Sequence, residues 1–137
     1  MKIDLYHLYR GLHFSKLAYP IVLDVLKVWA ESNGWEARVS ICPESKVDFD
    51  TDADVVGISV YSQTAPAAYR VADRLRERGK RVLFGGPHFR GTSTLAEASP
   101  HCDVIVTSIC EAQMRDLLAS IADGRLAPNQ AQPLHIV

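Results

Sequence analysis

Short apolar runs alternate with longer amphipathic segments along most of the chain, and this alternation limits its fold more than any other feature. The apolar runs cover residues 3–8, 55–60, 81–84 and 103–106, and residues 36–42 alternate in the manner of an edge strand. The amphipathic segments cover residues 15–32, 65–78 and 111–122. Strand-length runs separated by helix-length segments indicate βαβ units, whose strands lie parallel. The pattern therefore predicts a parallel sheet covered by helices.

Local signals refine this prediction. Residues 55–60 are almost all apolar and mostly β-branched, as is typical of a central strand buried on both faces. Ser15 is placed to cap the first helix, which we expect to begin at about Tyr19 or to kink at Pro20. Asn33 and Gly34 form its C-terminal stop. With right-handed crossovers, the chain is predicted to form a flavodoxin-like α/β fold: a doubly wound, five-stranded parallel sheet in a three-layer, Rossmann-like α/β/α arrangement.

Composition places the chain among ordinary globular domains. It has 137 residues, of which 47% are hydrophobic and 23% charged. Its 15 basic and 16 acidic residues nearly cancel, so charge favours neither a nucleic-acid nor a membrane partner. No stretch reaches the roughly 18 apolar residues of a membrane span, and the first residues do not resemble a signal peptide. Three cysteines make no disulfide framework, so we expect a cytoplasmic protein.

The carboxyl-terminal segment differs from the rest of the chain. Residues 125–137 carry Pro128, Pro133 and two glutamines, a composition typical of a linker or a truncated C-terminal extension. We therefore expect one domain over residues 1–124, followed by such a segment over residues 125–137.

The loop after the central strand is the first candidate site. Doubly wound sheets bind ligands beyond the carboxyl ends of their strands, which selects the loops at residues 7–14, 59–66, 85–93 and 107–111. In the second of these, hydroxyl and amide side chains precede a helix whose first N–H groups lack partners. Polar groups of a ligand would bind there. Alternatively, Ser62 or Thr64 caps the helix. The side chains of this cluster are Ser59, Tyr61, Ser62, Gln63 and Thr64.

Paired glycines mark the next loop, in the run Gly85-Gly86-Pro87-His88. Two residues without side chains at the end of a strand allow another backbone or a flat ligand to approach closely. The alternative is an ordinary Gly-Pro turn, with His88 as a solvated loop histidine. The glycine pair, more than the histidine, indicates a binding site.

The last loop opens the last helix with Thr107, Ser108, Cys110 and Glu111. Their hydroxyl and carboxylate groups would face the same sheet edge as the other two loops. Glu111 could equally complement the helix dipole. Cys110 lies near a helix N-terminus, where thiol pKa values fall, but no histidine is placed to pair with it.

Other motifs of known chemistry are absent from the sequence: it contains no Gly-x-Gly-x-x-Gly, no Walker loop and no Cys-x-x-Cys. Asp4, His7 and His13 could suggest a metal site. However, the strand alternation favours a structural His7 whose polar atoms are satisfied. We therefore predict no metal ligands and no catalytic residues.

Two of these loops together resemble a known family. Ser59-Val60-Tyr61-Ser62 and Gly85-Gly86 are similar to two parts of the pattern of cobalamin (vitamin B12)-binding domains, which is Asp-x-His-x-x-Gly, then Ser-x-Leu-[Ser/Thr], then Gly-Gly. Over residues 1–124, the chain most resembles the N-terminal domain of cobalamin-dependent radical SAM enzymes. Residues 54–59, residues 85–88, and residues 103–106 with Glu111 carry that likeness.

The resemblance implies that the nucleotide tail of cobalamin inserts between the sheet and its helices. The cofactor-binding residues that it implies are Ser59, Tyr61, Ser62, Gln63, Thr64, Gly85, Gly86, Pro87, His88, Thr107, Ser108 and Glu111. The chain departs from the family in two places. Asp4-x-x-His7-x-x-x-Gly11 lacks the spacing of the cobalt-ligating motif, which implies base-off cobalamin with no protein histidine on cobalt. Ser108-Ile109-Cys110-Glu111 replaces the usual Gly-Glu-Gly-Glu and keeps only its final glutamate.

The sequence has no Cys-x-x-x-Cys-x-x-Cys, the motif whose three thiolates hold the radical SAM iron–sulfur cluster. We therefore interpret the chain as a cobalamin-binding module and not as an enzyme by itself. It would support methyl transfer by a radical SAM catalytic domain, in cis or in trans, that holds the iron–sulfur cluster and S-adenosylmethionine. Two alternatives stay open: a degenerate domain that binds no cofactor and docks proteins, and a small-molecule enzyme that uses Cys110 or His88.

Overall fold

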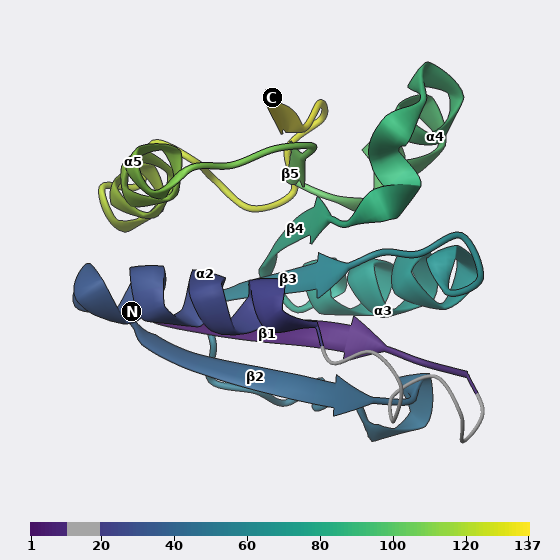
Figure 1. Ribbon diagram of the computed structural model, residues 1–137, viewed down its shortest axis with the longest axis horizontal. Helices are drawn as coiled ribbons and strands as arrows, with labels where there is room; N and C mark the ends of the chain where they lie inside the picture. Colours follow the sequence, from purple (N-terminus) through teal and green to yellow (C-terminus); the bar gives the residue numbers. More distant parts are fainter. Residues whose placement is uncertain (11–19) are drawn as a thin grey trace.

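The computed structural model describes residues 1–10 and 20–137, and shows one parallel sheet flanked by helices (Figure 1). The strand order is β2-β1-β3-β4-β5-β6, and every neighbouring pair is parallel. The first five strands of this order, 2-1-3-4-5, are those of the flavodoxin-like class, so the predicted fold class is confirmed. The strands are β1 (Lys2–Leu8), β2 (Glu36–Cys42), β3 (Val55–Ser59), β4 (Arg81–Gly85), β5 (Val104–Val106) and β6 (Leu134–Ile136).

The sixth strand corrects the predicted count of five. β6 comes from the segment that composition marked as a linker, and it pairs with β5 from Val104 opposite Leu134 to Val106 opposite Ile136. Its two prolines precede the strand, so they do not interrupt the pairing. The carboxyl-terminal segment thus adds an edge strand to the sheet.

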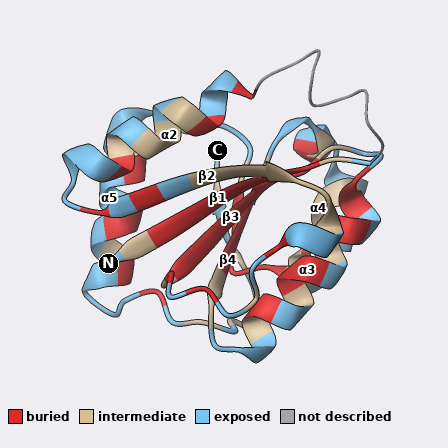
Figure 2. Ribbon diagram, turned by 90° about the horizontal axis from the view of Figure 1, so that it is seen from below, coloured by how far each residue is buried: buried red, intermediate tan, exposed pale blue. Residues whose placement is uncertain are grey.

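Helices form two layers, one on each face of the sheet (Figure 2). α2 (Ile21–Ser32) and α5 (Glu111–Ala122) cover one face, while α3 (Ala65–Glu77) and α4 (Thr92–Ala98) cover the other. Single 3₁₀ turns occur at η1 (Glu44–Lys46), η2 (Pro87–Arg90) and η3 (Ser99–His101). α3 and α5 begin where the sequence predicts, whereas the short helix α4 was not foreseen.

α2 begins at Ile21, directly after Pro20, whose missing N–H costs nothing at a helix start. It ends at Ser32 with Asn33 as its C-cap, and Gly34 follows with φ +80°, a left-handed conformation that suits glycine. The predicted cap Ser15 and start Tyr19 lie outside the described residues.

Strand alternation divides the core into two halves. Tyr6, Val56 and Phe84 point towards α3 and α4, whereas Ile3, Val55 and Leu83 point towards α2 and α5. Burial of these apolar side chains on both faces supplies most of the folding free energy. Within the described part of the chain, no helix is long and apolar enough to cross a membrane.

Candidate cofactor-binding site

The candidate site lies at the switch point of the sheet. From β1 the chain moves to β2 on one side, and from β3 onwards it moves to the other side. The loops that follow β1 and β3 therefore diverge, and they leave a crevice at the carboxyl ends of these strands.

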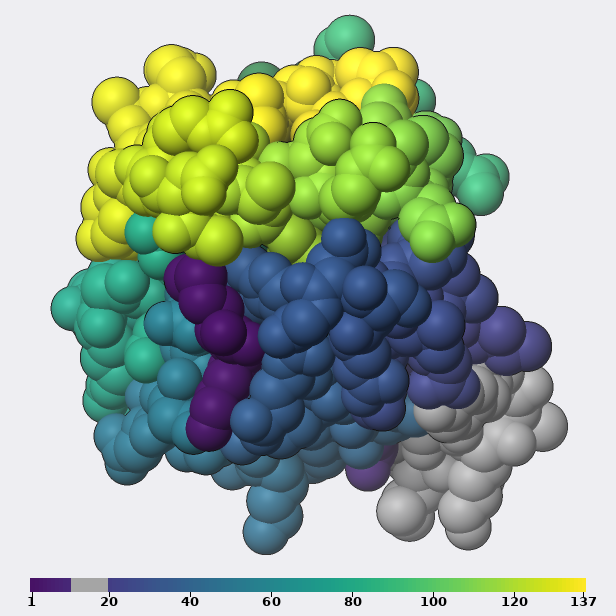
Figure 3. All heavy atoms as spheres, turned by 90° about the vertical axis from the view of Figure 1, so that its left-hand side faces the viewer, coloured from purple at the N-terminus to yellow at the C-terminus, as the bar shows by residue number. Residues whose placement is uncertain are grey.

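A cavity of about 270 Å³ opens there, between the sheet and helices α2 and α5. These two helices lie side by side over that face of the molecule (Figure 3). The cavity has apolar walls with polar groups at its sheet-edge end. Its walls from the helices are Val22, Leu23, Leu26, Met114 and Leu117, and its polar side chains are Ser59, Tyr61, Thr107 and Ser108.

The cavity floor consists of two rows across the sheet. Leu5, Gly57 and Leu83 are register partners on β1, β3 and β4, and they form the first row. The next row towards the carboxyl ends is His7, Ser59 and Gly85. Ser59 and Gly85 border the cavity, whereas the buried His7 lies beside them without bordering it. Side chains two residues apart on a strand share a face, so both rows point towards α2 and α5. The inner row is apolar and the outer row is polar.

Two glycines shape this floor. A Cβ at Gly57 would lie 2.9 Å from Cδ2 of Leu5, so the Leu5 side chain already packs across this glycine. A glycine inside a strand indicates close approach of another group, and here that group is Leu5. At Gly85 a Cβ would make only ordinary contact with the Val106 carbonyl, at 3.6 Å, so the cavity has room beside Ser59.

Gly86 shapes, through its backbone, the sheet-edge end of this cavity, which we call the slot. Its φ is +105°, and a Cβ there would lie 2.6 Å from the carbonyl oxygen of Val60 and 3.1 Å from Oγ of Ser59. The strands meet closely at this point, because the Val60 N–H donates to the Gly85 carbonyl at 2.7 Å. Only glycine fits this position without strain.

The structure divides the predicted cofactor-binding residues into two groups. One group borders the cavity: Ser59, Tyr61, Gly85, Gly86, Pro87, Thr107 and Ser108. The other group lies outside it: Ser62, Gln63, Thr64, His88 and Glu111. A direct contact of the second group with a cofactor stays a prediction.

His88 connects the loop at residues 59–66 with the loop at residues 85–93, on the α3 side of the sheet edge. Its Nδ1 lies 3.1 Å from the Ser62 hydroxyl, and its Nε2 lies 3.2 Å from the Tyr69 hydroxyl. The Tyr69 hydroxyl also donates to Glu97 at 3.1 Å, and burial is the main cause that raises the Tyr69 pKa. His88 is thus a bridging residue, and not a solvated loop histidine.

The loop at residues 59–66, which we call the serine loop, is explained only in small part by helix capping. Thr64 is the N-cap residue of α3, but its side chain makes no capping hydrogen bond. Its Oγ1 instead accepts the Tyr61 N–H at 3.3 Å, so it holds the turn itself. Gln63 is exposed at the same turn.

The last loop is closed by a capping box at the start of α5. The Cys110 N–H donates to the Gln113 side chain at 3.0 Å, and Glu111 is an exposed acid in the first turn. Cys110 is exposed, away from any histidine partner among the described hydrogen bonds. This arrangement gives the last loop a structural role.

His7 differs from its prediction. It is 1% exposed, and neither ring nitrogen has a hydrogen-bond partner among the described residues. Burial lowers the pKa of His7 below its ordinary value of 6.5. The expectation of a satisfied structural histidine was therefore wrong. The described residues contain no group of three or more metal-binding side chains, and His13 lies outside them.

Several cavity residues were not predicted. Gly57 could have been found, because it is a glycine inside an otherwise β-branched run. The helix walls, which include Val22, Leu26 and Met114, could not be found, since they look like ordinary core positions until the topology brings α2 against α5.

The cavity fits part of a large cofactor and not the whole. Its volume lies just below the roughly 300–1,000 Å³ of pockets that enclose drug-sized ligands. A flat base can lie over the apolar floor that Leu5 and Gly57 form, and the sugar and phosphate that follow it would meet the polar row at Ser59. A corrin ring would remain outside, at the sheet edge. The residues present therefore fit the tail of cobalamin.

Comparisons with known proteins agree with this geometry. The family model for the B12 binding domain matches residues 13–118, which contain all the predicted site residues. Bacteriochlorophyllide d C-8(2)-methyltransferase of Chlorobaculum tepidum is 38% identical over 81 residues, 59% of this chain and 18% of that protein. Bacteriochlorophyllide d C-12(1)-methyltransferase of the same organism is 37% identical over 73 residues, 53% of this chain and 16% of that protein.

The matched part is thus less than a fifth of the length of either methyltransferase. The family match covers most of the chain, and it includes β2, β3, β4, β5 and the loops at their carboxyl ends. The chain therefore belongs to the B12 binding domain family.

Proposed function

We propose that the chain binds cobalamin by its nucleotide tail and presents the corrin ring to a separate catalytic domain. The observation that carries this proposal is the cavity between the sheet and helices α2 and α5, with its apolar inner row and polar outer row. Its size suits a tail and excludes a whole corrinoid. When bound, cobalamin supplies the reactive cobalt, while the chain supplies binding and orientation.

The residues of the slot divide this task. Ser59 and Tyr61 supply hydroxyl groups where the tail enters, and Thr107 and Ser108 do so from the neighbouring loop. Gly85 leaves room beside Ser59 for the sugar and phosphate, and the base would lie over Leu5 and Gly57. The His88 bridge to Ser62 fixes the serine loop against the loop at residues 85–93, the glycine loop. Both borders of the slot are therefore positioned before a ligand arrives.

The larger protein that we propose is a cobalamin-dependent radical SAM methyltransferase. The two relatives are methyltransferases by name, and this chain matches less than a fifth of each. The iron–sulfur cluster and S-adenosylmethionine would belong to the partner domain, because this chain has no Cys-x-x-x-Cys-x-x-Cys. In this arrangement the module is a carrier that acts with its partner in cis or in trans.

The cofactor would bind base-off, because a tail held in the slot cannot also reach the metal. No protein histidine would ligate cobalt, because the sequence lacks the Asp-x-His-x-x-Gly motif. Electron paramagnetic resonance of bound cob(II)alamin tests this. We expect a spectrum without the nitrogen splitting of an axial ligand, and a visible spectrum of the base-off type. A protein that retains no corrin would support the alternative of a domain that docks proteins only. If the cofactor is retained and its spectrum shows nitrogen splitting, base-off binding is contradicted, whereas cobalamin binding itself is not.

A further inference from the structure

We infer that His7 hydrogen-bonds the ribose–phosphate part of the cobalamin tail and so makes the slot selective for corrinoids that carry a nucleotide. This inference rests on the proposed function, since it adds a contact to the same slot. His7 lies in β1, in register with Ser59. No part of the family pattern described above assigns it a role.

The first observation is the lack of partners for a deeply buried polar ring. Both ring nitrogens of His7 are buried, and neither has a hydrogen-bond partner among the residues that the structure describes. Native proteins satisfy nearly all buried polar groups, because an unpaired one costs folding free energy. A buried histidine that is left unpaired therefore indicates a group that arrives with a ligand.

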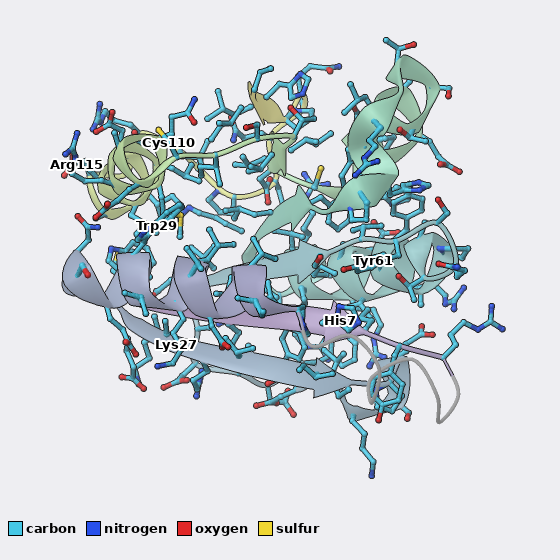
Figure 4. The ribbon with its side chains drawn as sticks, viewed as in Figure 1. His7, Lys27, Trp29, Tyr61, Cys110 and Arg115 are labelled. Atoms are coloured by element: carbon cyan, nitrogen blue, oxygen red, sulfur yellow. The ribbon has the colours of Figure 1, made fainter. Side chains whose placement is uncertain are left out.

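The second observation is its direction. Ile3 and Leu5 precede His7 at two-residue steps on β1, and both line the cavity. Alternation along the strand places the His7 ring on that same face, at the carboxyl end. There it stands edge-on to the ring of Tyr61, with ring centroids 5.1 Å apart and planes at 71° (Figure 4). His7 does not itself border the cavity, but it touches Tyr61 and is in register with Ser59, which both do.

The third observation is the kind of group that His7 can recognise. Burial lowers the pKa of His7, so the ring is neutral at pH 7 and offers one N–H donor and one acceptor nitrogen. A ribose hydroxyl can donate to the acceptor, and a phosphate oxygen can accept from the N–H. The flat base of the tail would lie over the apolar row at Leu5 and Gly57, which leaves the sugar and phosphate at the row that contains His7 and Ser59.

Two corrinoids separate this contact from other roles of His7. Hydroxocobalamin carries the nucleotide, whereas cobinamide has the same corrin ring without it. The dissociation constants of both are measured by equilibrium dialysis for the unchanged chain, His7→Phe and His7→Gln. His135→Phe is the matched control, because it removes an exposed histidine from the edge strand β6.

We expect His7→Phe to bind hydroxocobalamin about tenfold more weakly, the factor that corresponds to about 1.4 kcal/mol, and cobinamide with unchanged affinity. His7→Gln, which keeps a donor and an acceptor, should recover part of the loss. His135→Phe should change neither value. The melting temperature of His7→Phe should equal or exceed that of the unchanged chain, because the substitution removes an unpaired buried polar group.

Three results would overturn the inference while cobalamin binding stands. The first is unchanged hydroxocobalamin affinity in His7→Phe. The second is an equal loss for both corrinoids with a lower melting temperature, which would show a structural role. The third is the loss, in His7→Phe, of a nitrogen splitting present in the cob(II)alamin spectrum of the unchanged chain, which would make His7 a cobalt ligand. If the unchanged chain binds no hydroxocobalamin, the proposed function and this inference both fail.

Discussion

The carbonyl oxygen of Val60 lies 2.6 Å from the point where a Cβ at Gly86 would stand. Gly86→Ala must therefore separate the two loops that border the slot, and it must also hold alanine at a φ of +105°. We expect it to lower the free energy of unfolding by about 2 kcal/mol or more and to weaken cobalamin binding. Urea denaturation followed by circular dichroism measures the first effect.

Gly91→Ala is the control for that substitution. Gly91 has a φ of −131°, and a Cβ there would meet only the Ser93 hydroxyl, at 4.0 Å. Its free energy of unfolding should stay within about 0.5 kcal/mol of the unchanged chain. Equal stability of the two variants would show that the loops do not meet at Gly86 as described.

Gly85→Leu tests the slot without such strain. The position faces the cavity beside Ser59, and a Cβ there makes only ordinary contact with the Val106 carbonyl, at 3.6 Å. A leucine side chain would fill the space beside Ser59 that we assign to the sugar and phosphate, so we expect roughly a 100-fold loss of cobalamin affinity or more, with a nearly unchanged melting temperature. Gly91→Leu is the control of equal size. Tight binding by Gly85→Leu would place the tail elsewhere.

The burial of His7 predicts a dependence of stability on pH. Its pKa in the folded chain lies below the ordinary 6.5, so below pH 6.5 the unfolded chain binds more protons than the folded one. Titration of His7 therefore leaves the free energy of unfolding unchanged above pH 6.5. Below that pH it lowers this free energy, by at most about 1.4 kcal/mol per pH unit, as the pH falls towards the lower pKa of the folded chain.

His7→Phe removes this proton uptake. The free energy of unfolding of His7→Phe, minus that of the unchanged chain, should therefore rise as the pH falls from 6.5 to 5. Urea denaturation at several pH values gives this difference. A difference that stays constant over that range would show that His7 titrates alike in both states.

Asp103 attaches the carboxyl-terminal segment to the sheet. Its buried carboxylate accepts the N–H groups of Val82 at 2.8 Å and Gln130 at 3.0 Å, and it pairs with Arg76 at 3.2 Å. Asp103→Ala would leave the largely buried Arg76 unpaired, so we expect a loss of about 3 kcal/mol and faster amide exchange in β6. Asp123→Ala, which breaks an exposed pair with Arg125, should cost less than about 1 kcal/mol. Slow exchange in β6 of Asp103→Ala would argue against this attachment.

Asp103 also explains why the sixth strand was missed. β6 is three residues long and exposed at Leu134, so it has neither the length nor the apolar pattern of a strand. Its pairing depends on contacts of Asp103 and Arg76, more than 25 residues away in sequence. β3, by contrast, was predictable because burial on both faces demands a continuous apolar run, as residues 55–60 have. β2 was predictable from the alternation of an edge strand.

The candidate site was predictable where it depends on local backbone chemistry. Gly85 and Gly86 mark a close approach in any fold that places them at a strand end. The walls of the slot and the unpaired His7 depend on the packing of α2 and α5 over β1, which a single sequence does not reveal. For the same reason, His88 was predicted in the right loop, but its bridge to Ser62 and Tyr69 was not.

Equilibrium dialysis of hydroxocobalamin against the purified chain decides whether the chain holds cobalamin by its tail. We expect one corrin retained per chain at micromolar protein, and none retained by Gly85→Leu under the same conditions. No retention by the unchanged chain, or equal retention by both proteins, would show that the slot does not hold the tail.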